Sequence, residues 1–371
     1  MAAQSGKLYP LGDTDYAIPP GETLRELLDE KGLTQRELAR RADLSPKHVN
    51  RLLHGLVPLS ADVAERLERV TGTHARIWNR LEANYQSDLQ RLRTRRDLAE
   101  YAPWLVDMPV KALLERGILP KEPADKASRV EQMLSFFGVA SVDAWEEVYA
   151  GVACSFRQSK AYDAKPGAVA AWLRLGEIAA QDVRCQPFDP TGLRAVLPEL
   201  RALTSESPDV FSSKMRDICS AQGVAVVFIE EITGARTSGA TRWITPVKAL
   251  IQLSLRYRTD DHLWFTFFHE IAHVLLHGKT DVWIEGGSSD NDDPKEAEAD
   301  RFSREVLIPP KASSELAALK SDAAVRQFAA KVGVAPGIVV GRLQHDGYWA
   351  HSRGHQLKCR LVLTGTDTDA R

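Results

Sequence analysis

The chain has 371 residues, a formal net charge of −2, 44% hydrophobic residues and 26% charged residues. This length predicts two or three folding units at roughly 100–200 residues per domain, and the composition excludes a disordered or fibrous protein. The near-zero charge excludes a generic polyanion binder, so any contact with nucleic acid must come from a local patch.

The cysteines and the apolar segments indicate a cytoplasmic protein. The four cysteines lie far apart without CxxC pairing, which favours free thiols in a reducing compartment: Cys154, Cys185, Cys219 and Cys359. The first residues lack the basic-then-apolar profile of a signal peptide. The longest apolar runs, such as Val224–Ile229, are far shorter than the roughly 20 residues that span a bilayer, so we expect no membrane contact.

The pattern of elements predicts a mostly helical α+β chain in five parts. Residues 1–19 form an arm, 20–90 a bundle of short helices, 91–185 a helical middle region, 186–350 a C-terminal domain and 351–371 a tail. In the C-terminal domain, strands are expected at Val224–Ile232, Arg242–Ile244 and Lys248–Leu255, and helices at His262–His277 and Glu296–Leu307. These strands make a small sheet.

A helix-turn-helix is expected within residues 32–55. Thr34 and Glu37 fit a capping box, Ser45 caps the next helix, and Pro46 fits its first turn. Asp43 occupies the turn, where an aspartate tolerates left-handed backbone better than most residues. The second helix is then the recognition helix, which lies in the major groove of DNA.

The exposed side of this motif predicts contacts with double-stranded operator DNA. Lys47 and Arg51 could meet guanine edges, and Pro46 could touch a thymine methyl group. The complete set of expected DNA-binding residues is Gln35, Ser45, Pro46, Lys47, His48, Asn50 and Arg51. Residues 21–60 hold nearly equal numbers of basic and acidic residues, so affinity would depend on direct contacts and on a homodimer.

The segment resembles XRE-type helix-turn-helix domains, and most closely the HigA antitoxin branch. The matching stretches are Pro20–Leu24, Leu33–Gln35, Ser60–Ala64, Gly72–Thr73 and Trp78–Leu81, and the resemblance covers about residues 18–90. This resemblance implies a transcriptional regulator in an antitoxin or stress-response setting, with a toxin protein as a possible partner.

The strongest chemical signal is the HExxH motif formed by His269, Glu270 and His273. Residues four apart share one face of a helix, so the two imidazoles can bind one Zn²⁺ ion. Glu270 lies at the edge of that face, where it can act as the catalytic base on a water at the metal.

A downstream acidic helix offers the third ligand. Glu296 is the expected ligand, and Asp300, one turn later, is expected to hydrogen-bond a ligand histidine. Glu298 remains a rival, although it points about 160° away from Glu296 on an ideal helix. His277 is expected to cap the helix end or to support a ligand rather than bind the metal.

This region resembles the ImmA/IrrE family of metallopeptidases. The resemblance rests on Leu253–Tyr257, Phe265–Glu270, Leu275–Gly278, Glu296–Phe302 and Leu307–Pro309. It implies a zincin-like domain similar to gluzincins and cleavage of a repressor-like protein partner or of the chain itself. Two hypotheses stay open: a zinc metalloendopeptidase with a DNA-binding domain, or a non-catalytic regulator whose metal-binding domain is a sensor or partner-binding module.

Overall fold

A computed structural model describes residues 16–121, 125–149, 165–279, 282–285 and 293–362. Most of the expected arm, Cys154, and the end of the expected tail lie outside the described residues. The chain divides into two compact units, Met1–Ala102 with Asp125–Val130, and Pro103–Ala124 with Glu131–Arg371. Each unit is described by itself.

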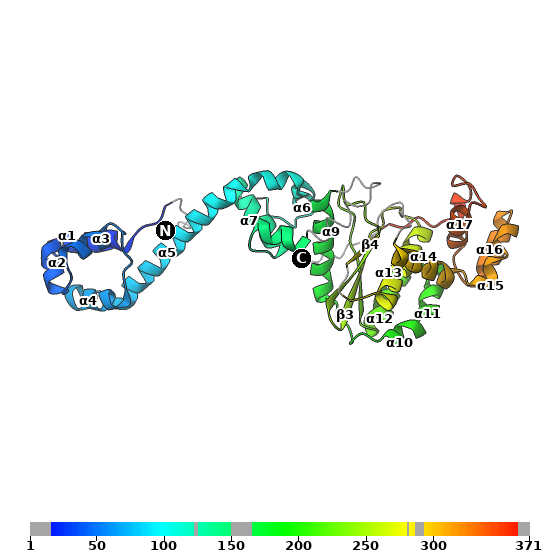
Figure 1. Ribbon diagram of the computed structural model, residues 1–371, viewed down its shortest axis with the longest axis horizontal. Coiled ribbons are helices and arrows are strands. Elements are labelled where there is room, and N and C mark those ends of the chain that lie inside the picture. The colour runs from blue at the N-terminus through cyan, green and yellow to red at the C-terminus, as the bar shows by residue number, and fades with distance from the viewer. Residues whose placement is uncertain (1–15, 122–124, 150–164, 280–281, 286–292, 363–371) are drawn as a thin grey trace, which may run out of the picture. The chain divides into compact units, whose positions relative to one another are not determined.

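The first unit is a helical bundle built around Leu24, Leu38, Leu53, Leu67 and Trp78, which are completely buried. Its helices are α1 (Pro20–Glu30), α2 (Gln35–Arg41), α3 (Pro46–Leu53), α4 (Ala61–Thr71) and α5 (Ala75–Glu100) (Figure 1). The helices α1, α2, α3 and α4 follow one another through short turns. Each of α2, α3 and α4 is preceded by a hydroxyl side chain that accepts a backbone N–H and so stabilises the start of the helix.

The turn between α2 and α3 is left-handed at Asp43, with φ of 54°, as the sequence predicted. Arg66 of α4 binds this turn, donating to the Asp43 carbonyl over 2.9 Å and pairing with its carboxylate over 3.3 Å. The expected capping box is only half formed. Thr34 accepts the Glu37 N–H, but the Glu37 carboxylate accepts from Arg40 and Arg41 instead, each over 2.7 Å.

The second unit contains a small mixed sheet among many helices, so the mostly helical α+β class predicted from the sequence is confirmed. Its strands are β1 (Val224–Phe228), β2 (Gly239–Thr245), β3 (Lys248–Leu253) and β4 (Trp283–Glu285). Its described α-helices are α6 (Val110–Glu115), α7 (Lys126–Phe137), α9 (Pro166–Asp182), α10 (Pro190–Ala195), α11 (Leu197–Ala202), α12 (Pro208–Ala221), α13 (Asp260–Leu276), α14 (Pro294–Leu307), α15 (Pro310–Ser313), α16 (Asp322–Val332) and α17 (Pro336–His345). The first residues of α7, up to Val130, belong to the first unit.

The sheet has the strand order β1-β3-β2-β4. β1 and β3 are parallel, whereas β2 is antiparallel to both of its neighbours. Strand β4 was not predicted, since three residues beside an acidic stretch give no alternating pattern. Its pairing places Trp283 opposite Thr241 at the edge of the sheet.

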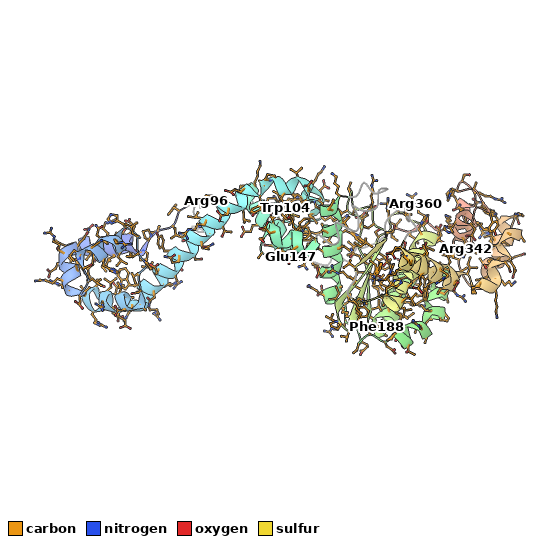
Figure 2. The ribbon with its side chains drawn as sticks, viewed as in Figure 1. Arg96, Trp104, Glu147, Phe188, Arg342 and Arg360 are labelled. Atoms are coloured by element: carbon orange, nitrogen blue, oxygen red, sulfur yellow. The ribbon has the colours of Figure 1, made fainter. Side chains whose placement is uncertain are left out.

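Both faces of the sheet are covered, which makes three layers (Figure 1). Val226 and Ile251 point to the face covered by α12 and α13, while Val227 and Leu250 point to the face covered by α9. Side chains fill the space between the layers (Figure 2). This alternation is the period of two expected of strands buried on both sides.

Helix α13 lies against β2 because Gly239 has no side chain. A Cβ atom there would stand 2.5 Å from Thr266 Cγ2 and 2.6 Å from Glu270 Oε1, distances that no real Cβ contact shows. The predicted helix His262–His277 is corrected at both ends: it begins at Asp260 and ends at Leu276, since His277 is already extended. Glycine at residue 239 therefore sets how closely the HExxH helix approaches the sheet.

The C-terminal helix α17 packs onto the N-terminal end of α13. Gly337 and Gly341 of α17 lie against the first residues of α13, and residues such as Val339 and Leu343 are buried in the shared core. Beyond them, Arg360 pairs with Thr259 in an antiparallel bridge (Figure 2 labels Arg360). Within the described residues no single helix is long and apolar enough to cross a membrane, although the bent pair α16 and α17 meets the criteria of length and composition.

Candidate metal centre and nucleic-acid interface

Three ligand atoms converge between α13 and α14. His269, His273 and Glu296 each offer one atom, and all three atoms lie within 4.8 Å of one another. Two nitrogens and one carboxylate oxygen are the donor set that Zn²⁺ takes in catalytic sites. Among the described residues this is the one such group that could hold a metal ion.

The spacing of the three atoms fits one tetrahedral ion. The Nε2 atoms of His269 and His273 are 2.9 Å apart, and Glu296 oxygens lie 3.0 Å from the first and 3.6 Å from the second. Ligands at 2.0–2.1 Å from a tetrahedral zinc stand about 3.3 Å apart. The residues present therefore fit the ion that the sequence predicted.

The Glu296 carboxylate is prepared to be an anionic ligand. Burial would raise its pKa, but hydrogen bonds and positive charge from His269 and His273 outweigh that effect and lower the pKa to about 2. Burial also lowers the pKa of His273, which favours the neutral imidazole. A neutral imidazole and a carboxylate are the protonation states that bind a metal.

Asp300 and Glu298 differ in the histidine that each contacts. Asp300 Oδ1 lies 3.0 Å from Nδ1 of His269, behind the nitrogen that faces the centre. Glu298, the rival ligand in the sequence, lies elsewhere: its Oε2 is 3.4 Å from Nε2 of His277. Two residues on one helix thus reach two different histidines of α13.

Glu270 is held by the sheet. Its side chain is completely buried, and Thr241 of β2 donates a hydrogen bond to its Oε2 over 2.6 Å. No sequence signal marked Thr241, because strand alternation does not reveal which face of β2 meets the HExxH helix. This hydrogen bond orients the Glu270 carboxylate toward β2.

Trp283 covers the centre from β4. Its ring stacks on His273 with centroids 4.5 Å apart and planes 12° apart, and it also contacts His277. The Lys295 ammonium lies 5.0 Å from the centroid of the same indole. Trp283 was missed from the sequence, since a single tryptophan beside an acidic stretch has no defined partner.

The expected DNA-binding residues lie on the first unit, around α3. Six of them are exposed: Gln35, Ser45, Pro46, Lys47, Asn50 and Arg51. His48 differs, because it is half-buried and its Nε2 is out of contact with solvent. Val49, Leu52 and Leu53 of the same helix are buried in the bundle core, which orients α3 with its polar side outward.

Comparisons with known proteins agree with this division. A helix-turn-helix family model matches residues 24–78, and the model of the IrrE N-terminal-like domain matches residues 219–344. The chain therefore belongs to the helix-turn-helix regulators of the XRE type through its N-terminal part, and residues 219–344 are similar to the IrrE N-terminal-like domain.

Individual relatives match the N-terminal part. The HTH-type transcriptional regulator YddM of Escherichia coli (strain K12) is 35% identical over 81 residues, which are 20% of this chain and 86% of the relative. Virulence-associated protein I of Dichelobacter nodosus is 37% identical over 78 residues, 20% of this chain and 72% of that protein. A solved structure of the Pseudomonas aeruginosa antitoxin HigA with the higBA promoter is 32% identical, with a TM-score of 0.21, and covers 22% of this chain and 90% of its own.

Proposed function

We propose that this chain is a cytoplasmic transcriptional regulator that binds operator DNA as a homodimer and carries a zinc-dependent endopeptidase. In this proposal residues 20–90 bind DNA, 91–185 form the middle region and 186–350 form the peptidase. The observation that carries it is the convergence of His269, His273 and Glu296, with Glu270 next to His269 on the same helix. The substrate class is a repressor-like protein partner or the chain itself, and a toxin protein is a further binding partner in this proposal.

In this proposal, different residues of the chain bind the metal, transfer the proton and position these groups during peptide hydrolysis. His269, His273 and Glu296 would hold Zn²⁺, which supplies a Lewis acid for the scissile carbonyl. Glu270 would accept a proton from the attacking water at a carboxylate oxygen and later deliver it to the leaving amine. Thr241 would keep that carboxylate in place, and Asp300 would fix the orientation of His269.

A second candidate is a regulator whose metal-binding domain does not catalyse. One observation favours it: the Glu270 side chain is completely buried, whereas a base in peptide hydrolysis must reach a water and a substrate. In that case the domain would bind a partner or an ion, and DNA binding would be the primary activity.

The substitution Glu270→Gln separates the two candidates. We would incubate the zinc-loaded full chain with a proteome-derived peptide library and map new N-termini by mass spectrometry. The endopeptidase proposal expects cleavage by the wild type and by Glu305→Gln, a matched change at an exposed position of α14, and none by Glu270→Gln. Equal cleavage by Glu270→Gln contradicts the role of Glu270. No cleavage by any of the three proteins supports the second candidate.

A further inference from the structure

Behind the candidate metal centre, two further side chains continue the line of hydrogen bonds that begins at His273. Nδ1 of His277 lies 2.8 Å from Nδ1 of His273, and Nε2 of His277 lies 3.4 Å from Oε2 of Glu298. The side chain of His277 is only 3% exposed, whereas that of Glu298 is 45% exposed. The line therefore runs from the buried centre to the surface of α14.

The placement of hydrogens along this line follows from the centre. Because Nε2 of His273 faces the other ligand atoms, its proton must be on Nδ1 when a metal is bound. Nδ1 of His277 must then accept that proton in a hydrogen bond, which puts the proton of His277 on Nε2. That proton points to Glu298, and a carboxylate is always able to accept it.

We infer that His277 and Glu298 are positioning residues that hold His273 in the one tautomer able to bind the metal. The inference rests on the proposed zinc site. The two ligand histidines are then supported differently. His269 has a carboxylate directly behind it, whereas His273 has a second imidazole between itself and the carboxylate of Glu298.

The surroundings restrict His277 to this orientation. Its backbone N–H donates to the His273 carbonyl at the end of α13, and Trp283 packs against the rings of both histidines. Oε1 of Glu298 also lies 3.9 Å from the guanidinium of Arg301, three residues further along α14. His277 also ends α13. The test therefore compares variants that lose the hydrogen bond to His273 with variants that keep it.

The test is zinc affinity of the full chain, measured by competition with a chromophoric chelator. His277→Phe keeps a ring of similar size but cannot accept the hydrogen bond, so zinc binding should weaken about 10–100-fold, the usual cost of losing a supporting partner. His277→Asn presents an amide oxygen close to the position of Nδ1 and should recover most of that loss. Glu298→Ala, at a half-exposed position, should weaken binding less than His277→Phe.

The outcomes separate this inference from the proposed site. Unchanged affinity in His277→Phe, or equal losses in His277→Phe and His277→Asn, overturns the positioning role while leaving the zinc site intact. If His277→Phe fails to fold, unchanged affinity in Glu298→Ala overturns it instead. A wild-type chain that binds no zinc overturns both the inference and the site. The d–d spectrum of the Co²⁺-loaded protein should change in His277→Phe and return toward wild type in His277→Asn.

Discussion

Thr241 shows how much a single hydroxyl contributes to the candidate centre. It donates to Glu270 Oε2 over 2.6 Å inside a completely buried environment, so removing the donor deprives a buried carboxylate of this bond. We expect Thr241→Val to lower the free energy of unfolding by about 1–3 kcal/mol, and Thr241→Ser, which keeps the hydroxyl, to lower it less. Urea denaturation of both variants measures the difference. Equal stability of the two variants would contradict the assigned hydrogen bond.

Asp260 gives the C-terminal unit a pH-dependent stability. Burial and the neighbouring Asp261 charge raise the pKa of Asp260 to about 6, although backbone N–H groups of Cys359 and Asp261 oppose the shift. Lys358 pairs with Asp261 over 2.6 Å, and His262 is the other titratable group nearby on α13. Because the folded pKa exceeds the unfolded value of 3.8, the protonated Asp260 carboxyl stabilises the fold. Its contribution to the free energy of unfolding is complete below pH 3.8 and is lost as the pH rises through 6.

The substitution Asp260→Asn tests whether the free energy of unfolding falls as the pH rises. The asparagine keeps one oxygen to accept the Cys359 N–H, but it cannot ionise. The wild type should therefore lose up to about 3 kcal/mol of unfolding free energy relative to the variant between pH 4 and pH 7. Unfolding free energies from urea titrations at several pH values measure this. A difference that is constant with pH, or that grows in the other direction, would contradict the raised pKa.

At the scale of elements, helix α3 is a solvent-facing helix whose polar side carries the expected DNA contacts. If Arg51 reads a base, Arg51→Ala should cost about 1–3 kcal/mol on the preferred DNA site and much less on random DNA. The preferred site would come from selection out of random duplexes, and binding would be measured at fixed salt. Arg76→Ala removes the same charge from an exposed position of α5 and is the matched control. Equal losses by Arg51→Ala on both DNAs would contradict base reading.

The elements that the sequence predicted best are those with strong local signals. The recognition helix begins after Ser45, the cap that the sequence predicted, with Pro46 in its first turn. The HExxH helix has a long apolar face, and its predicted bounds agree with the fold to within two residues. Residues four apart on one helix must share a face, which is why their spacing alone pairs His269 with His273.

Contacts between separate elements could not be predicted from the sequence. Strand β4, the stacking of Trp283 on His273 and the bond from Thr241 to Glu270 join segments that are distant in the chain. Their positions depend on strand order and on the close approach that Gly239 permits, neither of which a local pattern encodes. The capping box failed for a local reason, since Arg40 and Arg41, three and four residues further along α2, bind the Glu37 carboxylate.

At the scale of the whole molecule, one chain combines a helix-turn-helix domain and a region similar to the IrrE N-terminal-like domain, in two compact units. The candidate DNA contacts all lie in the first unit and the candidate metal ligands all lie in the second. Substitutions in one unit should therefore leave the primary binding activity of the other unit intact. This separation makes each half testable in the full chain.

The most direct test is the metal content of the full chain as purified, with His269→Ala and Arg51→Ala beside it. The proposed three-ligand centre predicts about one zinc per chain in the wild type and in Arg51→Ala, and almost none in His269→Ala. Elemental analysis by mass spectrometry measures all three proteins. Absence of metal from the wild type even after incubation with zinc, or equal zinc in His269→Ala, would contradict the centre formed by His269, His273 and Glu296.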